Sequence, residues 1–262
     1  MKSEVCVSVI MPTYNNSGFI GDAIESVLVQ SYPHFELIVV DDCSTDNTEE
    51  VLASIKDKRV KVYKLSENFG LPSKVRNYGI NCSKGHFIAF LDSDDQWHST
   101  KLEKQMAYMA RAPELAMIYT GGEWITREGI SFKRVLPRYK SGRILTNQLI
   151  KYEINNQGVL AKKQALEEFG LFDESIKIGE DYNLYMKILH KYKVGVISDS
   201  LFSYRKYSDS ISGKNKYDTK GLEVTLKYLR AEGVPWIKLI FLIVRIHSIK
   251  IKAIICPVVS PQ

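Results

Sequence analysis

The 262-residue sequence predicts an α/β fold in which a mostly parallel sheet is covered by helices on both faces. Three observations predict it. Short apolar runs alternate with amphipathic stretches through the first half of the chain. Two of these runs, ELIVV and FIAFL, are continuously apolar, as strands buried on both faces are. Both runs end abruptly in carboxylates, and ligands of open α/β sheets bind beyond the carboxyl ends of the strands.

Each predicted element rests on a local pattern. The run VCVSVIM (5–11) is typical of a strand, and in the stretch after it Ile20, Ile24 and Val27 share one helical face. Residues 126–145 predict irregular or antiparallel structure. Further strands are predicted over 36–42, 61–65, 87–92 and 117–125, and helices over 46–56, 73–81, 162–169 and 181–192, with another starting near Ser99.

Composition and charge exclude several classes of protein. With 45% apolar and 25% charged residues, the chain is neither low-complexity nor disordered. Its four cysteines are far apart, without a Cys-x-x-Cys pair or a histidine cluster, which argues against a disulfide framework and a zinc site. The first residues lack a signal-peptide pattern, so we expect a cytoplasmic protein. The net charge of +6 is concentrated in residues 201–262, which hold 11 Lys or Arg against 4 Asp or Glu.

The strongest motif is FLDSDDQW, in which Asp92, Asp94 and Asp95 follow an apolar strand. Three carboxylates in four residues repel one another unless a positive group lies among them. Mg²⁺ and Mn²⁺ prefer oxygen ligands, usually one or two carboxylates together with phosphates of the substrate. The motif therefore predicts a divalent-cation site, while the alternative is a solvated acidic turn that caps the helix starting near Ser99.

Two further acidic pairs lie at the ends of predicted elements, one at the end of a strand and one at the start of a helix. Asp41 and Asp42 end a buried strand, where a carboxylate can accept hydrogen bonds from a nucleotide; alternatively they only end the strand before a capped helix. Glu180 and Asp181 begin an amphipathic helix, where the helix dipole favours negative charge. The functional interpretation of this second pair is a general base, which must lie within hydrogen-bond distance of the hydroxyl that it deprotonates.

Together, these motifs and their surroundings resemble the family 2 glycosyltransferases, which have the GT-A fold. The resemblance is closest to bacterial enzymes that build O-antigen, capsule or teichuronic acid. It extends over roughly residues 5–210 and is carried, in order, by VSVIMPTYNNSGFIGDAIESVLVQSYPHFELIVVDDCSTDNT, KVRNYGI, HFIAFLDSDDQWHSTKLEKQ, GEDYNLYMKIL and LFSYRKYSDSIS. It implies a GT-A catalytic domain over 1–215, with a nucleotide-sugar-binding half (1–112) and an acceptor-binding half (113–215), followed by a helical segment over 216–262.

The resemblance also implies roles for residues at the nucleotide. Pro12, Thr13 and Tyr14 match the segment that lines the nucleotide, with Tyr14 near the uracil. Asp42 matches the position that binds the base, and Arg76 in KVRNYG matches the basic residue beside it.

Further roles follow for the acidic motifs. Asp92, Asp94 and Asp95 match the Asp-x-Asp(-Asp) motif, with Asp92 and Asp94 at the nucleotide sugar and Asp94 and Asp95 as metal ligands. Asp181 matches the catalytic base and Glu180 is its usual neighbour. In the string Tyr-Arg-Lys-Tyr (204–207), Arg205 is expected at the diphosphate, with a basic pair on a surface loop as the alternative.

The implied activity is inverting hexose transfer that depends on Mn²⁺ or Mg²⁺. The expected donor is a UDP-sugar, namely UDP-glucose, UDP-galactose or UDP-N-acetylglucosamine, and the expected acceptor is a hydroxyl of a saccharide linked to a polyprenyl diphosphate. An α-linked donor then gives a β-linked product. A nucleotidyltransferase would need a Gly- and Arg-rich phosphate loop, which MPTYNNSGF does not match. A non-catalytic, membrane-tethered nucleotide-sugar-binding module would not need both the acidic metal motif and the Glu-Asp pair.

The C-terminal segment over 236–256 is basic and apolar. Lys238, Arg245 and Lys252 recur every seven residues, and the longest unbroken apolar run is 239–244. A spanning helix needs about 20 predominantly apolar residues, so an interfacial helix on the inner face of the cell membrane fits better. Docking onto the catalytic domain or a partner subunit is the alternative. The interleaved apolar residues argue against nucleic-acid binding.

Overall fold

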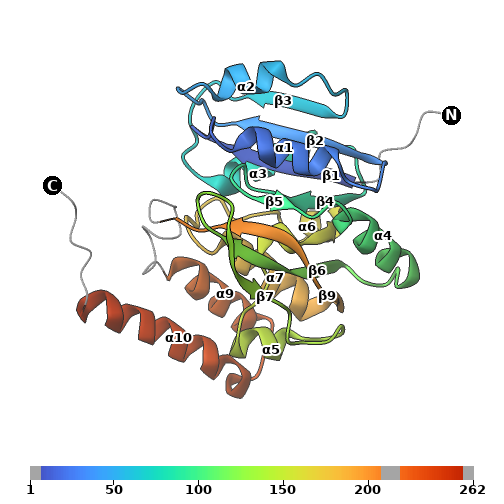
Figure 1. The fold of residues 1–262 in the computed structure, drawn as a ribbon. Helices are drawn as coiled ribbons and strands as arrows, with labels where there is room; N and C mark the ends of the chain where they lie inside the picture. Colours follow the sequence, from blue (N-terminus) through green and yellow to red (C-terminus); the bar gives the residue numbers. More distant parts are fainter. Residues whose placement is uncertain (1–6, 208–218, 256–262) are drawn as a thin grey trace.

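The computed structural model describes residues 7–207 and 219–255, and its α/β fold confirms the predicted class (Figure 1). Within these ranges one sheet of nine strands has the order β3-β2-β1-β4-β8-β6-β9-β5, and β7 pairs with β6. Helices cover both faces of this sheet. The strands are β1 (Val7–Thr13), β2 (Phe35–Asp41), β3 (Val60–Lys64), β4 (Phe87–Phe90), β5 (Gln96–Trp97), β6 (Met117–Ile125), β7 (Ser131–Val135), β8 (Leu160–Lys162) and β9 (Val194–Arg205).

The first four strands form a parallel half-sheet. β1 pairs in parallel with β2 and β4, and β2 pairs in parallel with β3. Thr13 stands opposite Asp41, and the amide of Asp42 donates to the carbonyl of Thr13 at 2.9 Å. The carboxyl ends of these strands therefore meet at one edge, which is where the sequence predicted that ligands bind.

Burial on both faces explains the continuous apolar runs. Val9 and Met11 of β1 belong to a core under α1 (Ile20–Leu28) and α4 (Lys101–Arg111). Ile10, between them, belongs to the opposite core, under α3 (Pro72–Cys82) and α7 (Glu180–Lys191). Because successive side chains of a strand point to opposite faces, a strand covered by helices on both sides is mostly apolar, and the buried polar exceptions Ser8 and Glu36 are hydrogen-bonded to each other at 2.7 Å.

The second half of the sheet is mixed rather than parallel. β8 pairs antiparallel with both β4 and β6, and β7 pairs antiparallel with β6, as the interpretation of residues 126–145 allowed. β9 pairs in parallel with β6 and antiparallel with β5. Neither β8 nor β9 was predicted, because β8 has only three residues and β9 interrupts its apolar positions with Ser and Asp.

The remaining helices pack beside the second half of the sheet. Within the segment expected to be helical (216–262), the described residues form α9, which packs against α7, and α10, which packs against α5 and α9 (Figure 1). No helix among the described residues is long and apolar enough to span a membrane. These elements are α2 (Thr48–Ser54), α5 (Leu145–Ile150), the 3₁₀ turn η1 (Asn156–Gly158), α6 (Lys163–Glu168), α9 (Lys220–Ala231) and α10 (Trp236–Ile255).

Candidate active site

A pocket of about 420 Å³ opens where β4, η1, α7 and α10 approach one another. Asp92 enters it from the loop after β4, and Glu180 and Asp181 enter it from the first turn of α7. Two of the three acidic motifs, which are far apart in the sequence, thus share one cavity. Its lining is Pro72, Arg76, Asp92, Tyr152, Ile154, Asn155, Asn156, Gln157, Lys177, Ile178, Gly179, Glu180, Asp181, Tyr182, Tyr204, Leu222, Arg245 and Ile249.

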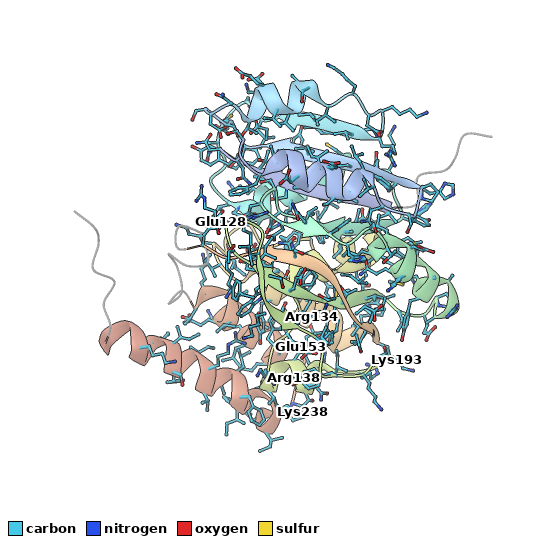
Figure 2. All side chains as sticks on the ribbon, in the orientation of Figure 1. Glu128, Arg134, Arg138, Glu153, Lys193 and Lys238 are labelled. Atoms are coloured by element: carbon cyan, nitrogen blue, oxygen red, sulfur yellow. The ribbon has the colours of Figure 1, made fainter. Side chains whose placement is uncertain are left out.

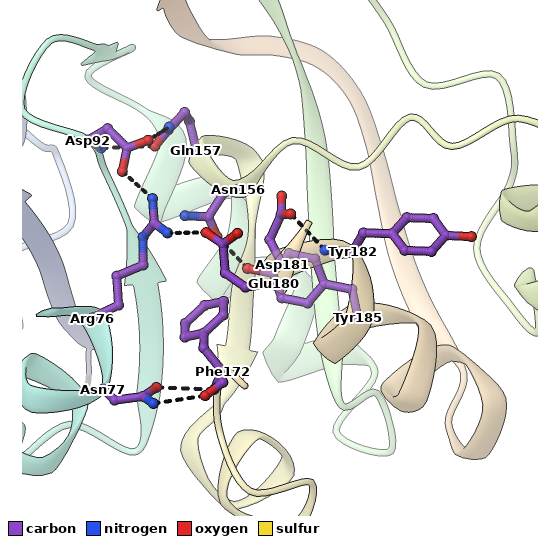
Figure 3. Close-up of polar contacts among 10 residues, drawn as sticks. All are labelled: Arg76, Asn77, Asp92, Asn156, Gln157, Phe172, Glu180, Asp181, Tyr182 and Tyr185. Carbon is purple, nitrogen blue, oxygen red and sulfur yellow. Dashed lines mark hydrogen bonds and ion pairs between the residues drawn. The ribbon is translucent and has the colours of Figure 1, made fainter. Parts of the chain in front are cut away.

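Arg76 joins the two acidic motifs. One guanidinium nitrogen pairs with Asp92 and another with Glu180, each at 2.7 Å, and only 6% of Arg76 is exposed (Figure 3). Burial alone would lower the pKa of Arg76, but the charges of Asp92 and Glu180 outweigh it and raise that pKa. Arg76 was expected beside Asp42; the structure directs its guanidinium to Asp92 and Glu180 instead.

Gln157 completes the environment of Asp92. Its side-chain Nε2 donates to the Asp92 carboxylate at 2.7 Å, and its side-chain Oε1 accepts from the backbone amide of Asp92 at 3.0 Å (Figure 3). The indole N–H of Trp97 donates to the backbone carbonyl of Gln157 at 3.0 Å. Asp92 is thereby fixed by hydrogen bonds to both of its oxygens. Sequence reasoning missed Gln157, since an isolated Gln in a 3₁₀ turn belongs to no motif.

The N-terminus of α7 places Asp181 in the pocket. Gly179 precedes the helix in the left-handed region (φ 82°), and Gly221 of α9 lies so close that an added Cβ would be 2.7 Å from the carbonyl oxygen of Gly179. One oxygen of Asp181 accepts from the amide of Tyr182 at 2.7 Å. Burial, together with the negative charge of Glu180, raises the pKa of Asp181 to about 7. A carboxylate with this pKa suits proton abstraction near neutral pH.

Asp94 and Asp95 lie outside the lining of this pocket. One oxygen of Asp95 accepts from the amide of Arg205 at 2.7 Å, while Asp94 accepts from the hydroxyl of Tyr207 at 2.7 Å. The other oxygen of Asp95 is buried and has no hydrogen-bond partner among the described residues. Burial, and then the neighbouring carboxylates, raise the pKa of both groups.

This donor set fits a divalent cation. An unpaired buried carboxylate oxygen beside a second carboxylate is the arrangement that a hard cation satisfies. Within the described ranges, no group of three or more His, Cys, Asp or Glu side chains is arranged to hold a metal. Mg²⁺ and Mn²⁺ sites commonly use one or two carboxylates and take their other ligands from substrate phosphates, so the two aspartates fit such a site.

Arg205 donates to backbone carbonyls around the acidic loop. It is 4% exposed, and its guanidinium donates to the carbonyls of Asp94 (2.9 Å), Thr126 (3.2 Å) and Arg127 (2.5 Å). Through Nε and Nη1, Arg205 holds the acidic loop against the segment after β6, and the expected contact with a diphosphate stays a prediction.

The four residues expected at the nucleotide lie at the ends of β1 and β2, outside the pocket lining. They are Pro12, Thr13, Tyr14 and Asp42. Thr13 is buried and Tyr14 is 51% exposed. Asp42 accepts from the amides of Phe69 (2.7 Å) and Gly70 (3.1 Å), and Pro12 lies opposite Val40 in the sheet. These residues share the carboxyl edge with the Asp92 loop, which is joined to the β1 loop by a hydrogen bond from Asn16 to Ser93 (2.7 Å).

Comparison with known proteins decides the family. The family model "Glycosyl transferase family 2" matches residues 8–163. The chain belongs to glycosyl transferase family 2. The putative teichuronic acid biosynthesis glycosyltransferase TuaG of Bacillus subtilis is 34% identical, over 80% of this chain and 82% of TuaG. Escherichia coli WfgD, named a UDP-Glc:alpha-D-GlcNAc-diphosphoundecaprenol beta-1,3-glucosyltransferase, is 35% identical over 82% of each chain.

The solved structures agree with this family. The fold of S. aureus TarS 1-349 in complex with UDP matches with a TM-score of 0.74 at 22% identity, over 96% of this chain and 72% of that one. The GT-A fold expected from the sequence is therefore confirmed, and this family 2 glycosyltransferase is a hexosyltransferase. Some Rickettsia relatives are longer, and this chain spans only 36%, 37% and 32% of three of them.

The ion pairs of Arg76 lead to a stability prediction for this family 2 glycosyltransferase. Arg76→Met leaves Asp92 and Glu180 without their shared cation, and breaking a buried pair in this way costs about 3–5 kcal/mol. Lys104→Met is the matched control, because it breaks an ion pair with Asp199 in which both side chains are about half exposed (45% and 51%). We expect this variant to lower the free energy of unfolding by less than about 1 kcal/mol. Urea denaturation measures both free energies of unfolding. Equal losses would contradict the structural role given to Arg76.

Proposed function

We propose that this family 2 glycosyltransferase moves a hexose from a UDP-hexose, with inversion, to a hydroxyl of a lipid-linked saccharide in bacterial surface-polysaccharide synthesis. The observation that carries the proposal is the single pocket shared by Asp92 and Asp181. Asp92 belongs to the motif proposed for the donor, and Asp181 has a pKa raised to about 7, as a base acting near neutral pH requires. A cavity that contains both groups can bring a donor sugar and an acceptor hydroxyl together.

The names of the relatives support the choice of substrates. WfgD is named for transfer from UDP-Glc to a diphosphoundecaprenol-linked GlcNAc, with a β-1,3 linkage. TarS was solved with UDP. On this basis we propose a UDP-hexose donor, from UDP-glucose, UDP-galactose and UDP-N-acetylglucosamine, and a polyprenyl diphosphate-linked acceptor. Pro12, Thr13, Tyr14 and Asp42 are proposed to contact the uridine.

The proposed reaction is a single displacement. Asp181 takes the proton of the acceptor hydroxyl as its oxygen attacks the anomeric carbon, the bond from that carbon to the diphosphate oxygen breaks, and UDP leaves with the electron pair. Attack from the face opposite the leaving group converts an α-linked donor into a β-linked product. Arg76 holds Asp92 and Glu180 in place during this step through its two ion pairs.

Asp94 and Asp95 are the residues proposed to hold a divalent cation. The unpaired oxygen of Asp95 and its neighbour Asp94 supply carboxylate ligands of the type that Mn²⁺ and Mg²⁺ accept. A bound Mn²⁺ or Mg²⁺ would neutralise the charge that develops on the departing diphosphate.

Helix α10 is proposed to attach the enzyme to the inner, cytoplasmic face of the cell membrane. Its residues Leu239, Leu242 and Ile246 are buried against the protein, so part of the helix docks as the alternative interpretation expected. The opposite side leaves apolar residues exposed, namely Ile237 (73%), Ile240 (47%), Phe241 (44%) and Val244 (58%). Basic residues accompany this outward face, and Figure 2 shows Lys238 near the start of the helix. Apolar surface beside cations suits an anionic lipid surface.

Release of nucleoside diphosphate tests the reaction and its metal requirement. The assay offers UDP-, GDP- and dTDP-sugars with short-chain polyprenyl diphosphate N-acetylglucosamine, in Mn²⁺, in Mg²⁺ and in EDTA. We expect acceptor-dependent release from one UDP-hexose that EDTA abolishes and that Asp95→Asn lowers by at least about tenfold. Undiminished turnover in EDTA would reject the metal, and release from GDP-sugars alone would reject the donor.

Asp181 should set the pH dependence of transfer. Only its ionised form can accept a proton, so with a pKa of about 7 the rate should rise roughly tenfold from pH 6 to pH 8. Asp181→Asn should lower transfer by about 10²–10⁴-fold and remove this rise. The control Asp22→Asn, on the exposed side of α1, should keep the wild-type profile. A pH profile that survives in Asp181→Asn would show that another group is the base.

Vesicle flotation measures the proposed membrane contact. The double variant Ile240→Ser/Phe241→Ser removes apolar area from the outward face of α10 and should weaken binding to anionic vesicles at least about tenfold. The matched control Ile130→Ser/Phe132→Ser changes the same residue types beside and within β7, where they are 65% and 55% exposed. Equal loss in the two variants, or none in either, would argue against α10 as the membrane contact.

A further inference from the structure

The pocket has a second side, which the displacement step does not use. There α9 contributes Leu222 to the lining, and α10 contributes Ile249 and a cation, Arg245. The residues of this side are Tyr152, Lys177, Tyr182, Leu222, Arg245 and Ile249.

The pocket lining carries charges of both signs. The carboxylates of the lining are Asp92, Glu180 and Asp181, and Arg76 pairs with the first two of them. Lys177, in the loop just before α7, and Arg245 of α10 also line the pocket; both are exposed, and neither has an ion-pair partner in the part of the chain that the structure describes. Two unpaired cations at the mouth of a substrate cavity form a site for an anion.

Two buried hydroxyls lie beside these cations. The hydroxyl oxygens of Tyr152 and Tyr182 have no hydrogen-bond partner among the described residues, although Tyr182 is only 4% exposed. The two rings meet edge to face at 4.7 Å, and the guanidinium carbon of Arg245 is 5.7 Å from the centre of the Tyr182 ring. Buried polar groups are normally satisfied, so these unpaired donors indicate a ligand with acceptor oxygens.

We propose that Arg245 and Lys177, with the hydroxyls of Tyr152 and Tyr182, bind the diphosphate of the lipid-linked acceptor. A diphosphate offers several acceptor oxygens and more than one negative charge, and a guanidinium binds phosphate oxygens through two parallel hydrogen bonds. The inference rests on the proposed function, because it names the residues that read the acceptor of that reaction.

The order of groups along the pocket matches such an acceptor. The ring of Tyr182 points away from the side chain of Asp181 (Figure 3), so the base and the ring that contacts Arg245 project in different directions from the start of α7. Arg245 is carried by α10, whose outward apolar residues include the preceding residue, Val244. A lipid tail attached to a diphosphate at Arg245 can therefore continue along the apolar side of the same helix.

Acceptor kinetics test the subsite. One acceptor is short-chain polyprenyl diphosphate N-acetylglucosamine, and the other is an uncharged octyl glycoside of the same sugar. We expect Arg245→Gln to raise KM for the diphosphate acceptor at least about tenfold, with kcat within about twofold, and to leave KM for the octyl glycoside unchanged. Lys177→Gln should act in the same direction.

Lys227→Gln is the control for the loss of one positive charge. Lys227 is exposed on α9, next to α10 and outside the pocket lining, so this variant should keep both KM values. Equal changes in KM for the two acceptors in Arg245→Gln, or no change for either, would overturn the subsite while leaving the proposed function intact.

A binding experiment separates failure of the subsite from failure of the function. Geranyl diphosphate is titrated by calorimetry into enzyme that is saturated with UDP and Mn²⁺, so that the donor site is filled. Binding that Arg245→Gln weakens at least about tenfold and Lys227→Gln does not supports the subsite, even if no sugar donor is turned over. Geranyl diphosphate binding that is equal in the wild type and Arg245→Gln would overturn the subsite, as would binding seen only when UDP is left out.

Discussion

The double ion pair of Arg76 is the interaction on which the site depends. It joins α3 to the loop after β4, 16 residues on, and to the first turn of α7, 104 residues on. A buried guanidinium with two carboxylates is stable only if all three groups stay in place, because any one alone would be an unpaired buried charge. The close packing of α3 on β1 supports this geometry: a Cβ at Gly79 would be 2.6 Å from a methyl group of Ile10. Asp92 and the first turn of α7, which carries Asp181, are thereby held in a fixed relation.

The sequence predicted the parts of this arrangement that are local or follow from strand direction. Continuous apolar runs identified β2 and β4, and the shared direction of parallel strands brought Asp42 and Asp92 to one edge. It could not predict how the long side chains would pair. Arg76 turns toward Glu180, 104 residues away, and Arg205 turns inward to backbone carbonyls. Gln157 was missed, and Arg245 was assigned to the basic stripe of the C-terminal helix rather than to the pocket, because the tertiary fold alone brings each to the site.

Helix α10 shows why the two interpretations of the C-terminal segment were not exclusive. A helix has more than one face, and in α10 Leu239, Leu242 and Ile246 pack inward at spacings of three and four residues. Ile237, Ile240, Phe241 and Val244 follow the same spacing on the outward side. The sequence therefore has apolar residues nearly all round, which is what docking on one face and a second apolar contact on the other require. Its cations keep it from being a spanning helix.

The position of α10 also links attachment to chemistry. One helix contributes inward packing, an outward apolar face and Arg245 in the lining of the pocket. If the outward face lies on a lipid surface, the mouth of the pocket beside Arg245 lies at the same surface, because both belong to one rigid helix. An acceptor anchored in that surface then meets the cations before it meets Asp181. Asp181 is the lining carboxylate that Arg76 does not pair with, and its charge repels a diphosphate, so charge favours the orientation in which the sugar faces Asp181.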